Sequence, residues 1–107
     1  MLQVLLMVLA PLSRIEELDS ELTRLCREDS AVRLDIGAGL DRLAALNGHH
    51  DLGFSSLGAY VRERLDRCPR WGQEARGLVS RVAHLPKIRR ALSEGRIGWS
   101  MASELAR

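Results

Sequence analysis

Five cationic side chains lie in the stretch Leu85–Arg107 of this sequence. Its first cations are Lys87, Arg89, Arg90 and Arg96. Four further residues point outward if the end of the stretch is helical: Ser100, Ser103, Glu104 and Arg107. Lysine and arginine neutralise phosphates, whereas serine, glutamate and arginine also hydrogen-bond base edges. These residue types favour binding of a polyanion such as a nucleic acid.

Catalytic and metal-binding chemistry has no comparable support. The histidines are His49, His50 and His84, and none stands at a motif spacing from a nucleophile or from further metal ligands. Cys26 and Cys68 lie far apart without metal-type spacing, so free thiols are expected. The sequence predicts no enzyme activity, no cofactor and no metal site.

Two short helices must position the charged side chains of Leu85–Arg107. Pro86 suits a first helical position, because the N–H that proline lacks would be unpaired there anyway. Gly95 stands where a helix ends in the left-handed conformation. The inner side of the second helix would consist of Ala102, Leu105 and Ala106. Two short helices joined by a glycine-containing turn predict a helix-turn-helix over residues 85–107.

The charge of the chain is divided unevenly between its halves. Residues 1–53 contain five arginines against nine acidic residues, whereas residues 54–107 contain ten arginines and Lys87 against five acidic residues. A basic half within a formal net charge of +2 indicates an anionic partner for that half. The alternative is a solvated arginine surface that reflects genome composition, since arginine outnumbers lysine fifteen to one.

Length and composition predict one all-α protein. A chain of 107 residues, 46% of them hydrophobic, can bury a modest core. The alternation typical of strands is absent, and Gly or Pro falls between the periodic runs. The apolar run at residues 1–10 is too short to span a bilayer, which takes about 20 residues. We therefore predict a cytoplasmic chain without membrane contact, in which residues 1–12 form a separate apolar segment. This segment is interpreted as the result of a start codon assigned too far upstream or as a first helix packed into the core. The alternative is a secretory signal.

Residues 13–47 predict a pair of antiparallel helices. Ser13 with Glu16 forms a capping-box pattern, and Asp29 or Ser30 would cap the second helix. The first helix would bury Ile15, Leu18, Leu22 and Leu25. The second would bury Val32, Ile36, Leu40, Leu43 and Leu46. A leucine seam of this kind serves either as core within the chain or as a dimer interface.

Residues 54–107 are expected to form a small helical domain. A loop over 47–53, opened by an Asn-Gly pair, leads to a third helix over 54–66 with Ser55 as its cap. Pro69 opens a fourth, strongly amphipathic helix. The predicted core is Tyr60, Val61, Leu65, Trp71, Leu78, Val79, Val82, Ile88, Leu92, Ala102 and Leu105.

Three blocks of this part match a known pattern. Gly53, Phe54, Ser56, Ala59, Tyr60, Glu63 and Arg64 fit G-F/Y-x-S-x-x-A-Y-x-x-E-R. Pro69-Arg70-Trp71 follows, and Leu85 to Ala106 fits L-P-x-x-R-x-A-L-x-x-G-R/E-I/L-x-W-S-x-A-x-x-L-A. With these blocks, residues 50–107 resemble the helical region that precedes the nuclease domain in bacterial HNH-endonuclease-type proteins, including a myxobacterial subgroup. The last block also resembles the helix-turn-helix of ParB-type partition proteins.

The resemblance implies a DNA-targeting region without nuclease activity. An HNH nuclease contains paired histidines, an asparagine and often CxxC pairs, and none of these follows the last block, so the chain is interpreted as an N-terminal fragment of such a protein. Gly98 stands where the family pattern has a serine cap. We expect weak, mostly non-specific binding of double-stranded DNA. The alternative is a protein-interaction module, in which the 13–47 hairpin forms a homodimer or docks a nuclease subunit; a non-functional remnant would fail to fold stably.

Overall fold

The structure, a computed structural model, describes the backbone of residues 2–107 and the side chains of residues 2, 3 and 13–107. Within this range the chain forms helices and turns without a strand, so the all-α prediction is confirmed. The helices are α1 (Leu2–Ala45), α2 (Gly48–Asp51), α3 (Leu57–Arg64), α4 (Pro69–Val82), α5 (Pro86–Ser93) and α6 (Trp99–Leu105). No helix in this described part is long and apolar enough to cross a membrane. The three interpretations of segment 1–12 stay predictions, because the side chains of residues 1 and 4–12 lie outside the described residues.

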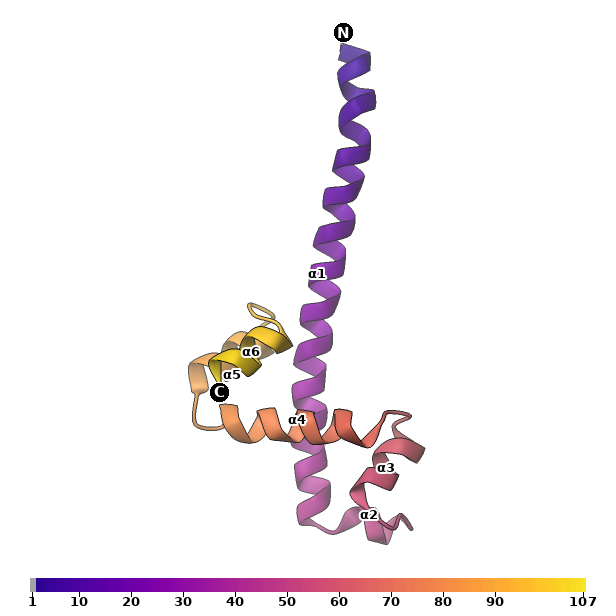
Figure 1. Cartoon of the computed structure of the whole chain (residues 1–107), viewed down its shortest axis with the longest axis vertical. Coiled ribbons are helices and arrows are strands. Elements are labelled where there is room, and N and C mark those ends of the chain that lie inside the picture. The colour runs from indigo at the N-terminus through magenta and orange to yellow at the C-terminus, as the bar shows by residue number, and fades with distance from the viewer. Residues whose placement is uncertain (1) are drawn as a thin grey trace.

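α1 runs without a break from Leu2 to Ala45, so the hairpin predicted for residues 13–47 is wrong (Figure 1). The predicted turn contains no Gly, Pro or Asn to reverse the chain. Ser30 does not cap a helix start there, because it lies inside α1 and its hydroxyl donates to the Cys26 carbonyl oxygen one turn earlier, at 2.9 Å. The helix ends beyond Ala45, where Asn47 adopts the left-handed conformation with φ 55°.

Most residues expected inside the hairpin lie in solvent. Their exposed fractions are 61% for Ile15, 59% for Leu18, 61% for Leu22, 45% for Leu25, 54% for Val32 and 77% for Leu46. The N-terminal half of α1 projects beyond the other helices, which pack against its C-terminal half (Figure 1). The face of α1 that packs there contains Leu34 and Leu40, each 3% exposed. Burial on α1 is therefore decided by where the later helices dock.

α4 crosses α1 at a close approach of the two backbones (Figure 1). A Cβ atom placed on Gly37 would lie 2.7 Å from the carbonyl oxygen of Ala75, so only glycine fits this position. Gly39 faces open space instead. Gly37 thus sets how closely α4 packs on α1.

The main core lies between α1, α4, α5 and α6. Its buried residues are Leu34, Leu78, Val82, Leu92, Ala102 and Ala106. Of the other predicted core residues, Val61 is buried, and Tyr60, Leu65, Trp71, Val79 and Ile88 are partly buried. The prediction for Leu105 is wrong, since 55% of it is exposed. On α6 the inner face follows Trp99, Ala102 and Ala106, a helical spacing that turns Leu105 outward.

The segment between α1 and α4 differs from its prediction in two details. The expected loop over 47–53 contains the one-turn helix α2. Ser56 rather than Ser55 caps α3, since its hydroxyl oxygen accepts a hydrogen bond from the Ala59 N–H at 3.0 Å. Both cysteines are free and exposed.

Candidate nucleic-acid interface

α5 begins and ends, and α6 begins, where the sequence signals predict. Pro86 opens α5, and Gly95 follows its end with φ 74°, a conformation that glycine adopts without a side-chain clash. α6 starts at Trp99 after Gly98, which is extended and has no side chain to accept a capping hydrogen bond. The segment is thus two short helices joined by a five-residue turn, 94–98.

The predicted phosphate-binding residues are only partly brought together. Lys87, Arg90 and Arg96 line one shallow hollow with Pro86, where α5 meets the turn. Arg89 is exposed on α5 but does not line this hollow. Arg96 pairs with Glu94 at 2.9 Å, whereas the described residues provide no ion pair for Lys87, Arg89 or Arg90. These cations are therefore available to an external anion.

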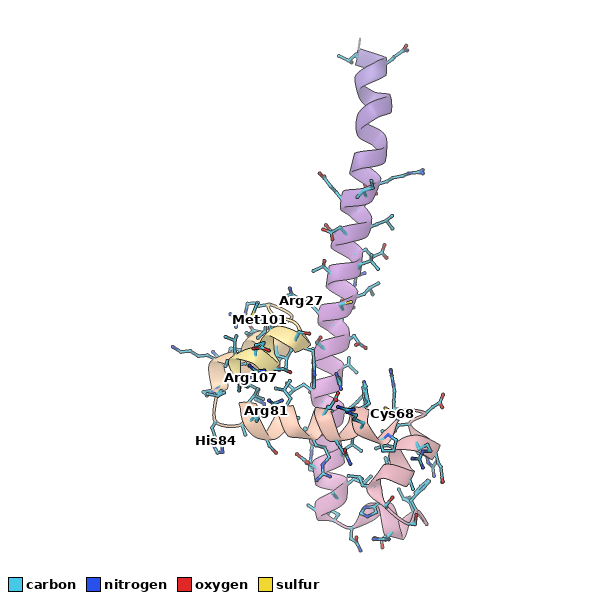
Figure 2. All side chains as sticks on the ribbon, viewed as in Figure 1. Arg27, Cys68, Arg81, His84, Met101 and Arg107 are labelled. Carbon is cyan, nitrogen blue, oxygen red and sulfur yellow. The ribbon has the colours of Figure 1, made fainter. Side chains whose placement is uncertain are left out.

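The predicted base-reading residues lie on another side of the segment. Ser100, Ser103 and Glu104 line a hollow between α4 and α6 together with Arg81 and Trp99. Arg107 lies 3.6 Å from the Glu104 carboxylate and is exposed. The outward side of α6 also contains Met101 and Leu105, each 55% exposed. Figure 2 shows Met101 on α6 and Arg107 just beyond its end, with Arg81 on α4. This side is mixed in character rather than basic.

Two residues of α1 hold the turn in place, and sequence reasoning missed both in this role. The guanidinium of Arg27 donates to the carbonyl oxygens of Arg96, at 2.7 Å, and Gly95, at 3.5 Å. One turn later, the hydroxyl of Ser30 accepts a hydrogen bond from the Trp99 N–H at 3.2 Å. Ser30 therefore satisfies the first N–H of α6, at a helix start whose N-cap residue, Gly98, has no side chain to accept a hydrogen bond. Ser30 carries a capping signal in the sequence, but local reasoning assigns that signal to its own helix.

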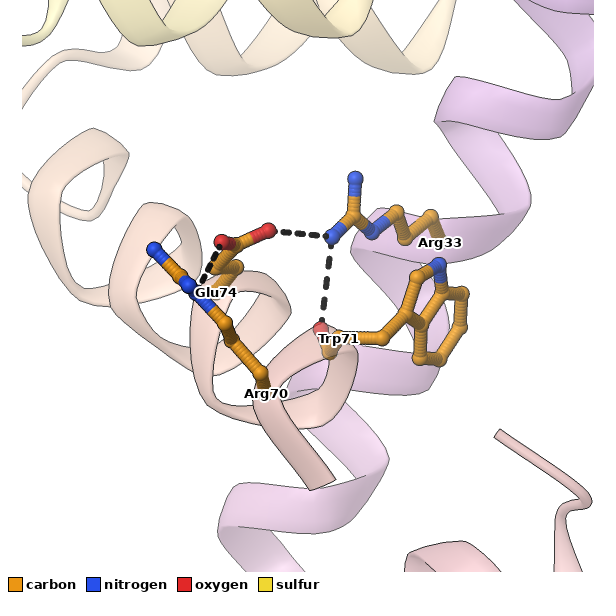
Figure 3. A network of polar contacts seen from close by, with 4 residues as sticks. All are labelled: Arg33, Arg70, Trp71 and Glu74. Carbon is orange, nitrogen blue, oxygen red and sulfur yellow. Dashed lines mark hydrogen bonds and ion pairs between the residues drawn. The ribbon is translucent and has the colours of Figure 1, made fainter. Parts of the chain in front are cut away.

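Arg33, the next residue of α1 on this side, is clamped between two aromatic rings. Its guanidinium carbon lies 5.0 Å from the ring centre of Trp71 and 4.1 Å from that of Trp99. Its Nη2 donates to the Trp71 carbonyl oxygen and to Glu74, both at 3.3 Å, and Glu74 also accepts from Arg70 at 3.2 Å (Figure 3). The Arg33 side chain is only 14% exposed, so it serves packing and not phosphate binding.

The described part of the chain contains no group of three or more His, Cys, Asp or Glu side chains that could hold a metal ion. His49 and His50 lie on α2 with ring centres 4.3 Å apart.

No protein-family model, curated protein or solved structure matches this chain.

Proposed function

We propose that this chain is a non-catalytic DNA-binding module in which α5 and α6 act as a helix-turn-helix. The observation that carries the proposal is the convergence of Lys87, Arg90 and Arg96 on one solvent-open hollow where α5 meets the turn. In helix-turn-helix docking, the second helix enters the major groove and cations on the supporting segments hold phosphates. The resemblance of residues 50–107 to the region that precedes HNH nuclease domains supports the same assignment, and nuclease activity is no part of it.

The character of α6 sets the expected binding mode. This helix spans only Trp99–Leu105, and its outward side combines Glu104 with Met101 and Leu105. A carboxylate repels phosphates, and the apolar side chains offer few partners to base edges. We therefore expect phosphate contacts to dominate, with weak, mostly non-specific affinity around the micromolar range or poorer at physiological salt.

The test measures how the affinity for a short DNA duplex depends on salt concentration, using fluorescence anisotropy. Each phosphate neutralised contributes about 0.9 to the log–log slope. The double variant Lys87→Gln/Arg90→Gln should weaken binding equally for unrelated duplex sequences and flatten the slope by up to about two units.

The matched control removes two exposed arginines that lie outside the α5–α6 segment, in the variant Arg42→Gln/Arg62→Gln. It lowers the net charge by the same amount and should leave the slope nearly unchanged. Equal effects of the two double variants would show that binding responds to net charge alone and would refute the assigned interface.

A second candidate function, docking of a protein partner, is favoured by the exposed Met101 and Leu105 on α6. Large apolar side chains on an outward helix face are typical of protein interfaces. Wild-type protein that binds no duplex at low salt would leave this candidate as the better explanation of the α6 surface, with a nuclease subunit as one partner class.

A further inference from the structure

One apolar stripe follows α1 in an unbroken heptad frame. Its members alternate at spacings of three and four residues: Ile15, Leu18, Leu22, Leu25, Val32, Ile36 and Leu43, with Asp29 and Gly39 at the two remaining positions of the frame. In coiled-coil notation Ile15 and Leu22 are a positions, and Leu18 and Leu25 are d positions. The buried residues Leu34 and Leu40 lie off this frame, but Leu40 lines one hollow with Ile36 and Leu43, so only the N-terminal part of the stripe is separate from the core.

The part of the stripe from Ile15 to Leu25 has no partner within the described chain. Each of its four large side chains is at least 45% exposed, on the half of α1 that projects beyond the other helices (Figure 1). Further along α1, Ile36 and Leu43 line a hollow together with Tyr60 and Leu65, so this end of the stripe lies beside α3. In the other direction the same frame has Pro11 at d, Val8 at a and Val4 at d.

An isolated helix gains little stability from its own hydrogen bonds in water, and natural helices are stabilised mainly by packing an apolar face. A two-stranded coiled coil is the arrangement that buries a stripe only two positions wide per heptad. A β-branched residue at a with leucine at d, as in Ile15 and Leu18, is the pattern that favours two strands.

The charges beside the stripe identify the second strand. In a parallel pair, each g residue meets the e residue five positions later on the other strand. Arg14 is at g and Asp19 is at e, so two copies of this chain form the opposite-charge pair twice. In the antiparallel alignment that pairs Ile15 with Leu25, Asp19 and Glu21 would each face their own copies, and this repulsion would offset the attractive Arg14–Glu28 pairs of that alignment. The stripe is therefore self-complementary in the parallel orientation.

We propose that α1 pairs with α1 of a second copy as a parallel, in-register coiled coil over Ile15–Leu25. Asp29 occupies the next a position, where two carboxylates would meet at the dimer axis. Pairing therefore ends before the segment that holds α4, α5 and α6, and the two helical bodies separate there. This proposal rests on α1 alone and is independent of DNA binding.

Analytical ultracentrifugation of the full chain provides the first test. The wild type should sediment as a dimer. Leu18→Glu/Leu22→Glu should be monomeric, because carboxylates would replace the apolar contacts, while retaining its cooperative thermal transition. The control Ser20→Glu/Thr23→Glu places the same charges on the same turns away from the stripe and should remain dimeric. A monomeric wild type at about 100 μM, or a dimer that survives the Leu18→Glu/Leu22→Glu change, would refute the proposal.

A charge exchange tests the identity and orientation of the strands. Arg14→Glu and Asp19→Arg should each weaken the dimer roughly fivefold to tenfold, because two attractive pairs become repulsive. Arg14→Glu/Asp19→Arg together should restore wild-type affinity. In the antiparallel alignment the double variant would remain weaker than the wild type, since the carboxylate introduced at position 14 would face Glu28 of the other strand.

Cross-linking gives an independent reading. In a background with Cys26→Ser and Cys68→Ser, Leu18→Cys should form an intermolecular disulfide, because equivalent d positions face each other in a parallel pair. Failure of both the charge rescue and this cross-link would overturn the parallel arrangement.

Discussion

The hydroxyl of Ser30 and the backbone N–H of Trp99 are joined by a 3.2 Å hydrogen bond across 69 residues of sequence. The same hydroxyl donates to the Cys26 carbonyl oxygen, so one serine satisfies its own helix and caps another. Through this contact and the Arg27 bonds to the turn, α1 determines where α6 begins.

Loss of that cap should be measurable as a loss of stability. Ser30→Ala should lower the free energy of unfolding by about 1 kcal/mol, within the range of about 0.5–2 known for helix caps. Urea denaturation provides the measurement. The control is Ser20→Ala at an exposed position of the same helix. It raises the helix propensity of α1 by the same amount but removes no contact to α6, so it should be neutral or slightly stabilising.

A local cap should add to the distant one. Gly98→Ser places a hydroxyl at the N-cap of α6, in extended backbone that serine adopts freely. An N-cap oxygen accepts from the second or third N–H of its helix, here that of Ser100 or Met101, whereas Ser30 accepts from the Trp99 N–H. Gly98→Ser should therefore raise the free energy of unfolding by the same few tenths of a kcal/mol in the wild type and in the Ser30→Ala background. A rescue confined to the Ser30→Ala background would contradict this expectation and show that the two hydroxyls serve the same N–H.

Two glycines of α1 should respond to alanine with opposite signs. Gly37→Ala should destabilise the protein by about 1–3 kcal/mol, because the new methyl group would overlap the backbone of α4. Gly39→Ala should stabilise it by up to about 1 kcal/mol, since its Cβ meets nothing within 4 Å and alanine is the better helix former. Thermal melting of the pair checks the contrast; stabilisation by both substitutions would refute the close crossing.

The clamp around Arg33 should depend on the planar guanidinium. Arg33→Lys should cost about 1–3 kcal/mol, because an ammonium group cannot stack on Trp71 and Trp99 while bonding the Trp71 carbonyl oxygen. It should also shift tryptophan fluorescence in the folded state. The control Arg70→Lys changes a side chain that is 85% exposed and should stay within about 0.5 kcal/mol of wild type, with unchanged fluorescence.

Local signals predicted the second half of the chain well, and long-range contacts account for the errors in the first. Pro69, Pro86 and Gly95 mark helix boundaries through their own backbone preferences, so their positions can be read without tertiary knowledge. Ser30 has the same residue type as a helix cap, but its partner lies on another helix, and the resulting false boundary produced the hairpin.

The candidate site shows the same division. Its residues follow from composition and spacing, whereas the cations line one hollow and Ser100, Ser103 and Glu104 line another because of the way in which α6 lies beside α4. Arg27 and Arg33 read as ordinary surface arginines in the sequence. Their roles arise only from the helices that pack beside them.

The unbroken course of α1 fixes the angle about its axis between the exposed stripe and the face that holds α4. One inserted residue between Leu25 and Arg27 would rotate these two surfaces relative to each other by about 100°, and seven residues by only about 20° from their original phase. The effect of an insert in α1 should therefore depend on the rotation that remains after whole helical turns are subtracted, and not on the number of residues inserted. In any assembly that forms through the stripe, α5 and α6 would have one fixed orientation about the axis of α1.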